Sequence, residues 1–211
     1  MNIQQQIYYH LQQHGTIYIF MIGLFLMGII FGSVIVNSMN FIQKEDLYFY
    51  LSQFFEQIVD ESAPSFGAIF KNSYFFHLKY LLLIYVLGLS IIGLPLVWIL
   101  VFLKGLFIGF TVGFIVNQLG VQGLILAAIS IAPQNLIIIP MYVIAGSFAM
   151  IFSLLLMRKL IQSNISFSIL RPFQIYSVIF VVLLITSLVS SVLETYVSHS
   201  AMYSYLKTLY N

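Results

Sequence analysis

Residues 93–140, GLPLVWILVFLKGLFIGFTVGFIVNQLGVQGLILAAISIAPQNLIIIP, decide the fold. The stretch is almost wholly apolar, and its single charge, Lys104, is also the only charged residue between Lys79 and Arg158. A soluble fold of this size cannot bury so much apolar surface, so we infer that this stretch lies in a lipid bilayer. In lipid every backbone N–H and C=O needs a partner inside the protein, so irregular backbone persists only where it is buried or lines a cavity. The glycines and prolines that interrupt the stretch are therefore predicted to be structural features.

The composition of the whole chain agrees with this interpretation. Of its 211 residues 61% are hydrophobic and only 7% are charged, whereas roughly a quarter of an ordinary globular chain is charged. The net charge of +2 is too small and too scattered to favour nucleic-acid binding. The absence of cysteine excludes disulfides and thiolate chemistry. We expect an all-α fold, a polytopic helical bundle integral to the membrane that forms a single domain over residues 1–211.

Hydropathy and charge predict about five membrane-spanning helices. The predicted spans cover residues 16–36, 80–103, 105–119, 136–157 and 174–193. Lys104 marks the boundary between the second and third spans, and Pro95 predicts a kink within the second because it lacks a backbone N–H. Residues 120–135 are predicted to form a short or re-entrant segment, and the number of spans rises to six if this segment crosses the membrane.

The basic residues predict the orientation of these spans, because Lys and Arg are enriched in short cytoplasmic loops. Lys104, Arg158, Lys159 and Arg171 are therefore expected on the cytoplasmic side, together with the N-terminus. The C-terminal tail then lies outside. So does the loop 37–79, which holds five of the six acidic residues.

The loop 37–79 is predicted to contain amphipathic helices, because its apolar residues recur at helical spacing. The face in question consists of Leu47, Leu51, Phe54, Phe55 and Ile58. Two interpretations are open at this point. The face rests on the membrane surface, or it is presented to a partner protein.

Two series of glycines predict close helix packing. Gly28 and Gly32 lie four residues apart in the first span, and Gly105, Gly109 and Gly113 continue the same spacing in the third. Small residues at this spacing let the backbones of membrane helices approach closely. The partner helix belongs either to the same subunit or to another copy in a homo-oligomer.

Pro133, Gln134, Asn135 and Pro140 are predicted to form a polar site where a helix is broken. A side-chain amide without a partner in hydrocarbon costs several kcal/mol, so Gln134 and Asn135 should bond to other helices, to freed backbone or to water. Their role is either to hold helices together or to bind a ligand. We recognise no charged pair inside a span, no zinc motif and no catalytic constellation. No catalytic, metal or cofactor site is therefore expected, and the protein is predicted not to be an enzyme.

A series of short sequences distributed from the first span to the last carries a resemblance to a known family. They are Phe31-Gly32-Ser33, Asn37-Ser38, Gln43-Lys44-Glu45-Asp46-Leu47-Tyr48, Leu51-Ser52-Gln53-Phe54-Phe55, Asn72-Ser73, Leu78-Lys79-Tyr80-Leu81, Ile91-Ile92-Gly93-Leu94-Pro95, Phe102-Leu103-Lys104-Gly105, Gly109-Phe110-Thr111-Val112-Gly113-Phe114, Val116-Asn117-Gln118 and Pro133-Gln134-Asn135-Leu136-Ile137. Together they resemble the stage II sporulation protein M family of endospore-forming Gram-positive bacteria.

The resemblance implies a multi-pass protein of the mother-cell membrane, located at the sporulation septum and the engulfing membrane. It further implies a scaffold that recruits stage II sporulation proteins D and P, the peptidoglycan hydrolases that remodel the septal wall during engulfment of the forespore. An alternative from a different class is a permease-like subunit of an ATPase-driven transport or mechanotransmission complex. In that case the broken helices of the third and fourth spans would line a path.

Overall fold

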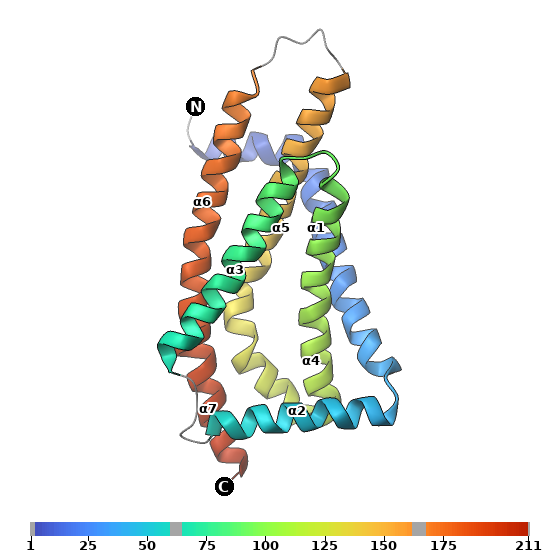
Figure 1. Cartoon of the computed structure of the whole chain (residues 1–211), viewed down its shortest axis with the longest axis vertical. Coiled ribbons are helices and arrows are strands. Elements are labelled where there is room, and N and C mark those ends of the chain that lie inside the picture. Colours follow the sequence, from blue (N-terminus) through green and yellow to red (C-terminus); the bar gives the residue numbers. More distant parts are fainter. Residues whose placement is uncertain (1–2, 60–64, 162–167, 211) are drawn as a thin grey trace.

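The computed structural model describes residues 3–59, 65–161 and 168–210, and every regular element in these ranges is a helix (Figure 1). In chain order the elements are α1 Ile3–Ser38, α2 Phe41–Val59, α3 Phe66–Gly88, α4 Leu94–Ser130, α5 Ala132–Ile161, α6 Leu170–Leu193, the π-helix η1 Glu194–Ser198, and α7 His199–Tyr210. The predicted all-α, polytopic helical bundle is confirmed.

Five of these helices form the body of the bundle, and α2 closes one of its ends. Helices α1, α3, α4, α5 and α6 run along the long axis, whereas α2 lies across the end that also holds α7 (Figure 1). The N-terminus lies at the opposite end (Figure 1). The described part of the chain has four helical segments long and apolar enough to cross a membrane. They are Tyr8–Ser38, Leu94–Ser130, Ala132–Ile161 and Leu170–Lys207.

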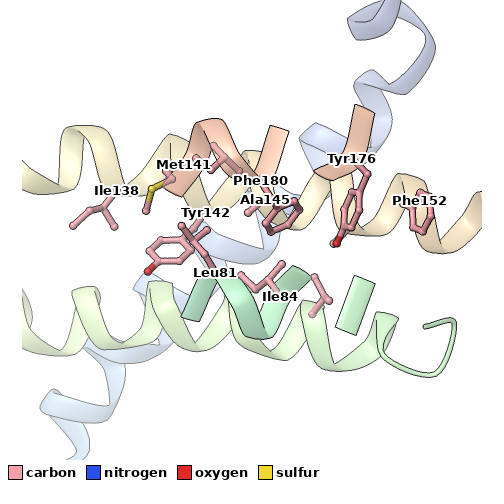
Figure 2. Close-up of a cluster of buried hydrophobic side chains, with 12 residues drawn as sticks. Leu81, Ile84, Ile138, Met141, Tyr142, Ala145, Phe152, Tyr176 and Phe180 are labelled. Carbon is pink, nitrogen blue, oxygen red and sulfur yellow. The ribbon is translucent and has the colours of Figure 1, made fainter. Parts of the chain in front are cut away.

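Helix α3 is less apolar than those four because it carries Lys71, His77 and Lys79. It nevertheless lies inside the bundle. Leu81 and Ile84 of α3 belong to a fully buried cluster that also takes residues from α4, α5 and α6 (Figure 2). Its twelve buried members are Leu81, Ile84, Val97, Ile138, Met141, Tyr142, Ala145, Ala149, Phe152, Tyr176, Phe180 and Leu183. We call this set the central apolar cluster.

The glycines of α1 lie directly against the backbone of α4. A Cβ atom added to Gly28 would collide with the carbonyl oxygen of Phe102, and one added to Gly32 would collide with that of Leu106. Side chains are therefore excluded from this contact. The two backbones touch along more than one helical turn.

The glycines of α4 form the other half of the same contact. A Cβ added to Gly105 would meet the carbonyl oxygen of Phe25, and one added to Gly109 would meet that of Ile29. At Gly113 the approach is looser, with 3.3 Å between the added Cβ and the nearest α1 atom. The partner of the predicted glycine series is thus a helix of the same chain, and each series packs on the other.

The predicted second and third spans need correction. A helix over 80–103 is not present, because α3 ends at Gly88 and α4 begins at Leu94. Pro95 lies in the first turn of α4, where a backbone N–H would have no intrahelical partner. Its missing N–H therefore breaks no hydrogen bond, so Pro95 begins this helix and does not kink it. Gly93 is required in the turn, because a Cβ there would collide with the carbonyl oxygen of Leu87.

Lys104 is consequently not a boundary between two helices. It lies in the eleventh position of α4, which continues without a break from Leu94 to the kink at Gly120. A hydropathy reading places a lone charge at the membrane surface because it assumes that the charge has no partners inside the bundle. The structure provides such partners, as described below.

The segment 120–135 is helical but folds back. Gly120 has a φ of 58°, the left-handed region that glycine enters at little cost, and it interrupts the helical geometry inside α4. After this turn Gly123 packs against Ile115, in contact so close that a Cβ on Gly123 would meet the Ile115 carbonyl oxygen. Whether the segment re-enters a membrane stays a prediction.

The ends of the helices keep the predicted polarity despite the shifted boundary. Arg158 and Lys159 close α5 and Arg171 opens α6, at the end of the bundle where α3 turns into α4 (Figure 1). Helix α2, with its acidic residues, lies at the other end. The turn that is predicted to be cytoplasmic moves from Lys104 to residues 89–93, and the number of passages between the two ends is unchanged.

Cysteine labelling tests this corrected boundary, because the chain has no native cysteine. Ile92 is 84% exposed in the turn, and Gln53 is exposed on α2. We expect Gln53→Cys to react with an impermeant maleimide in intact cells, and Ile92→Cys to react only after permeabilisation. An unreactive Ile92→Cys in permeabilised cells would instead favour the continuous span over 80–103.

The glycine contact predicts a sharp contrast between two similar substitutions. Gly109→Ala places a methyl group against the α1 backbone, and overpacking typically costs ~1–3 kcal/mol. Gly23→Ala adds the same methyl group where nothing lies within 4 Å. We expect a lower unfolding temperature in detergent for Gly109→Ala, and an unchanged or higher one for Gly23→Ala. Equal unfolding temperatures would show that α1 and α4 are not packed as described.

Candidate functional site

Polar side chains from three parts of the chain meet inside the bundle. Ser73 and His77 come from one face of α3, Tyr142 from α5, and Glu194 from the first position of η1. Ser73 Oγ donates a hydrogen bond of 2.5 Å to Glu194 Oε2, and His77 Nε2 lies 3.9 Å from the same oxygen. His77 Nδ1 and the Tyr142 hydroxyl share a hydrogen bond of 2.8 Å. A proton on His77 Nε2 and a lone pair on Nδ1 would suit both neighbours.

The ammonium group of Lys104 lies beside this network and over three aromatic rings. Its Nζ is 4.7 Å from the ring centroid of Phe76, 5.0 Å from that of Tyr142 and 5.6 Å from that of Tyr80. Each such cation–π contact is favourable by roughly 0.5–2 kcal/mol. Among the described residues none accepts a hydrogen bond from Lys104 or forms a direct ion pair with it. Its N–H donors are available to a further group.

The glycine contact determines where Lys104 points. Successive helical residues are rotated by about 100° around the helix axis. Because Gly105 and Gly109 face α1, a neighbouring face of α4 points toward α3 and α5. Lys104, Ile108 and Thr111 lie on that neighbouring face at helical spacing, and all three line one cavity. The packing of α1 on α4 and the position of the buried cation are therefore coupled.

This cavity has a volume of ≈ 400 Å³, and we call it the inner cavity. Its walls include Lys104, Glu194 and His77 as well as the side-chain amides of Gln134 and Asn135. A volume of this size falls within the range of about 300–1,000 Å³ that small-molecule sites occupy. The inner cavity thus combines one cation, one carboxylate and several neutral polar groups.

A second cavity of ≈ 450 Å³, the outer cavity, adjoins the first. The two have six lining residues in common, Asn72, Ser73, Thr111, Ile131, Gln134 and Glu194. The outer cavity extends from there to Phe55 and Ile58 of α2 and to Met202 of α7. Together the cavities lead from the α2 end of the bundle to Lys104.

Beyond Lys104 the core is mainly apolar, although Ser147 and Ser153 are buried there with their hydroxyls bonded to backbone carbonyls. Leu81 and Ile84 follow His77 on α3, Ala145 follows Tyr142 on α5, and all three belong to the central apolar cluster (Figure 2). These side chains are fully buried. The arrangement is that of a pocket with an end, and not of a continuous path through the bundle.

Several polar atoms along the cavities lack a partner. Within the described part of the chain, five buried side-chain atoms make no hydrogen bond, and three of them line these cavities. They are Gln134 Oε1, Ser130 Oγ and Ser198 Oγ. Buried polar groups nearly always have a hydrogen-bond partner, so these three atoms, which are covered by surrounding protein atoms, are exceptions.

Glu194 owes its position to a change in helix type. Helix α6 ends at Leu193, and the next five residues form the π-helix η1. π-helical turns are rare and are found frequently at functional sites. Near this turn Ser191 donates to the Ser187 carbonyl and Thr195 to the Ser191 carbonyl, so neither hydroxyl donates to Glu194, whereas Ser190 Oγ and Ser198 Oγ have no partner. The carboxylate of Glu194 contacts Ser73 and His77 of α3 and lines the inner cavity.

The predicted broken-helix site is only partly assembled. Pro133 stands in the first turn of α5, and Asn135 Nδ2 donates a hydrogen bond of 2.7 Å to the Ile131 carbonyl. Gln134 lines both cavities. Its buried Oε1 has no hydrogen-bond partner. Pro140 lies inside α5 on another groove, with His10, and is not part of this site.

The predicted partner-facing surface of α2 needs correction. Phe55 and Ile58 are buried inside the chain, where they pack with Ile115, Leu126 and Leu206, and Leu51 packs partly against the same cluster. Phe54 is 49% exposed and lines the outer cavity together with Leu51. Leu47 is half-buried. The face is occupied because it supplies the apolar side that holds α2 across the bundle end.

Sequence reasoning missed the charged residues of this site. The absence of a charged pair inside a span was inferred from sequence neighbours, whereas Lys104 and Glu194 are far apart in sequence and line the same cavity. One signal was available. An ionisable residue inside an apolar stretch is by default a functional-site candidate with a partner elsewhere in the bundle, and Lys104 meets that description.

Comparison with known protein families identifies the family of this chain. The family model described as stage II sporulation protein M matches residues 21–199. The chain belongs to the stage II sporulation protein M family. The resemblance seen in the short sequences is thereby confirmed, and with it a membrane protein of sporulation. No curated protein and no solved structure is similar enough to match this chain.

The matched region contains the whole polar site. Ser73, His77, Lys104, Tyr142 and Glu194 all lie between residues 21 and 199. So do both glycine series and α2. The site is therefore part of the family domain of this stage II sporulation protein M relative, and α7 lies almost entirely beyond the match.

The hydrogen bond between His77 and Tyr142 can be tested by removing one hydroxyl. Tyr142→Phe keeps the packing but leaves the buried His77 Nδ1 without its partner, which costs about 1–3 kcal/mol. We expect a lower unfolding temperature in detergent. Tyr50→Phe, at an exposed position on α2, serves as the matched control and should have no effect. Equal unfolding temperatures for the two variants would mean that the bond does not form.

Proposed function

We propose that this sporulation membrane protein is a scaffold that recruits stage II sporulation proteins D and P to the mother-cell side of the septum and engulfing membrane. In this proposal the partners carry out peptidoglycan remodelling, and the chain itself catalyses no reaction. The family supports a role in sporulation, and the observation that carries the docking role is the placement of α2.

Helix α2 has two different faces. Its inner face is buried by Phe55 and Ile58, which fixes the helix across the end of the bundle. Its opposite face presents Ile42, Phe49, Gln53 and Glu56, all exposed to the outside of the bundle. We call these four residues the outer face of α2.

The outer face of α2 suits a protein partner. Phe49 is 58% exposed and Ile42 69% exposed, whereas Glu56 adds a negative charge to the same face. Aromatic side chains at the centre of an interface contribute most of its binding energy. The basic residues at the far end of the bundle favour an extracytoplasmic position for α2, which is the side where wall hydrolases act.

The permease-like subunit remains a second candidate because of one observation. A buried Lys104 and Glu194 at a polar cavity are the kind of intramembrane groups that mark substrate or ion pathways. Against a complete path stands the central apolar cluster beyond Tyr142. A cytoplasmic ATPase that co-purifies with the protein in place of the hydrolases would favour this candidate.

The docking role is tested by changing the outer face of α2. We expect Phe49→Ala combined with Glu56→Lys to leave the amount of protein in the membrane unchanged. Loss of a central aromatic contact costs on the order of 2 kcal/mol, so co-purification of proteins D and P from sporulating cells should fall steeply. Sporulating cells should then arrest before engulfment is complete.

The matched control is Ile185→Ala, which changes an exposed apolar side chain on a different helix, α6. It should retain both partners. If the double variant also retains proteins D and P at the normal level, the outer face of α2 is not the docking surface and the proposal fails.

A further inference from the structure

The two connected cavities contain groups that call for a ligand of a particular charge pattern. Lys104 offers N–H donors that no described residue accepts, and Glu194 offers a carboxylate that is 33% exposed. Gln134 Oε1, Ser130 Oγ and Ser198 Oγ are buried along the same walls without partners. Because these atoms come from α4, α5 and η1, the site is built by the fold and is not a local surface feature.

We propose that the inner cavity binds a zwitterionic ligand of the amino-acid or short-peptide class. The ligand's carboxylate pairs with Lys104, and its ammonium group pairs with Glu194. This activity goes beyond the scaffold role and does not depend on it.

Charge balance selects the zwitterion. The cavity already holds one positive and one negative side chain, so a ligand with a net charge would leave an uncompensated charge in an environment of low dielectric constant. A ligand that is neutral overall but carries both signs satisfies each side chain separately. Charge-assisted hydrogen bonds of this kind are roughly twice as strong as neutral ones.

The aromatic rings restrict where the carboxylate binds. Phe76, Tyr80 and Tyr142 cover part of the Lys104 ammonium. On the other side Ser73 and His77 hold the Glu194 carboxylate in place. Both charged groups are thus pre-oriented, which lowers the entropy lost on binding.

The location of the opening fits ligands from outside the cell. The outer cavity leads to α2 and α7 at the end opposite Arg158, Lys159 and Arg171. The central apolar cluster ends the pocket on the other side. The ligand therefore has a route of entry from the α2 end of the bundle.

The test uses full-length protein in lipid nanodiscs and three probes titrated by calorimetry. The probes are the dipeptide Ala-Ala, Ala-Ala with an amidated C-terminus, and N-acetylated Ala-Ala. We expect saturable binding of Ala-Ala, and a loss of about tenfold to a hundredfold for each capped peptide, because each cap removes one charge-assisted hydrogen bond. This comparison needs no variant and so does not depend on any variant's folding.

Two variants assign the contacts. Lys104→Met should bind Ala-Ala and its amide equally weakly, and Glu194→Gln should bind Ala-Ala and its acetylated form equally weakly. Lys159→Met, at the other end of the bundle, is the control and should bind like the unmodified protein. The unfolding temperature and elution volume of each variant report whether it is folded.

The proposal is overturned by either of two results. One is the absence of saturable Ala-Ala binding at millimolar concentration, which means that the cavities hold only water. The other is equal binding of the capped and uncapped peptides, which means that the charged groups do not contact the ligand. Neither result would bear on the recruitment of proteins D and P.

Discussion

The backbone contact between α1 and α4 is the constraint on which the rest of the structure depends. At Gly28, Gly32, Gly105 and Gly109 no side chain fits between the two helices. Hydrophobicity contributes little to the association of helices in lipid, so close packing of this kind has to hold them together. Because it also fixes the rotation of α4, it turns Lys104 away from lipid and toward α3 and α5.

A second constraint follows from the bilayer. A charged group inside a membrane bundle persists only where other parts of the protein compensate it, and here the compensation is divided among several helices. Three rings face Lys104, whereas Ser73 and His77 hold Glu194. The resulting cavity lies under α2, the helix whose outer face we propose as the docking surface for proteins D and P. A pocket that senses a ligand and a surface that holds hydrolases would thus share one end of the molecule.

The sequence was sufficient for features that depend on composition and regular spacing. The helical class and the family follow from the apolar stretches and the short sequences, and the five-residue face of α2 is recognisable from its spacing. The boundary at Lys104 was misplaced because a lone charge looks the same at a membrane surface and inside a bundle. Its neighbours in space, Tyr142 and Glu194, are separated from it by many residues. The position of Glu194 depends on a π-helical turn that has no simple sequence signal.

Lys104 lies in a cavity inside the bundle, and this cavity continues to the α2 end. The most direct measurement is the reaction of Lys104→Cys with a small impermeant methanethiosulfonate reagent, followed in intact and in permeabilised cells. We expect the cysteine at position 104 to be modified in intact cells, because the reagent reaches it from the extracytoplasmic side through the two cavities. Modification only after permeabilisation would place Lys104 at the cytoplasmic boundary, and no modification under either condition would exclude the open cavity. Either result would contradict the account.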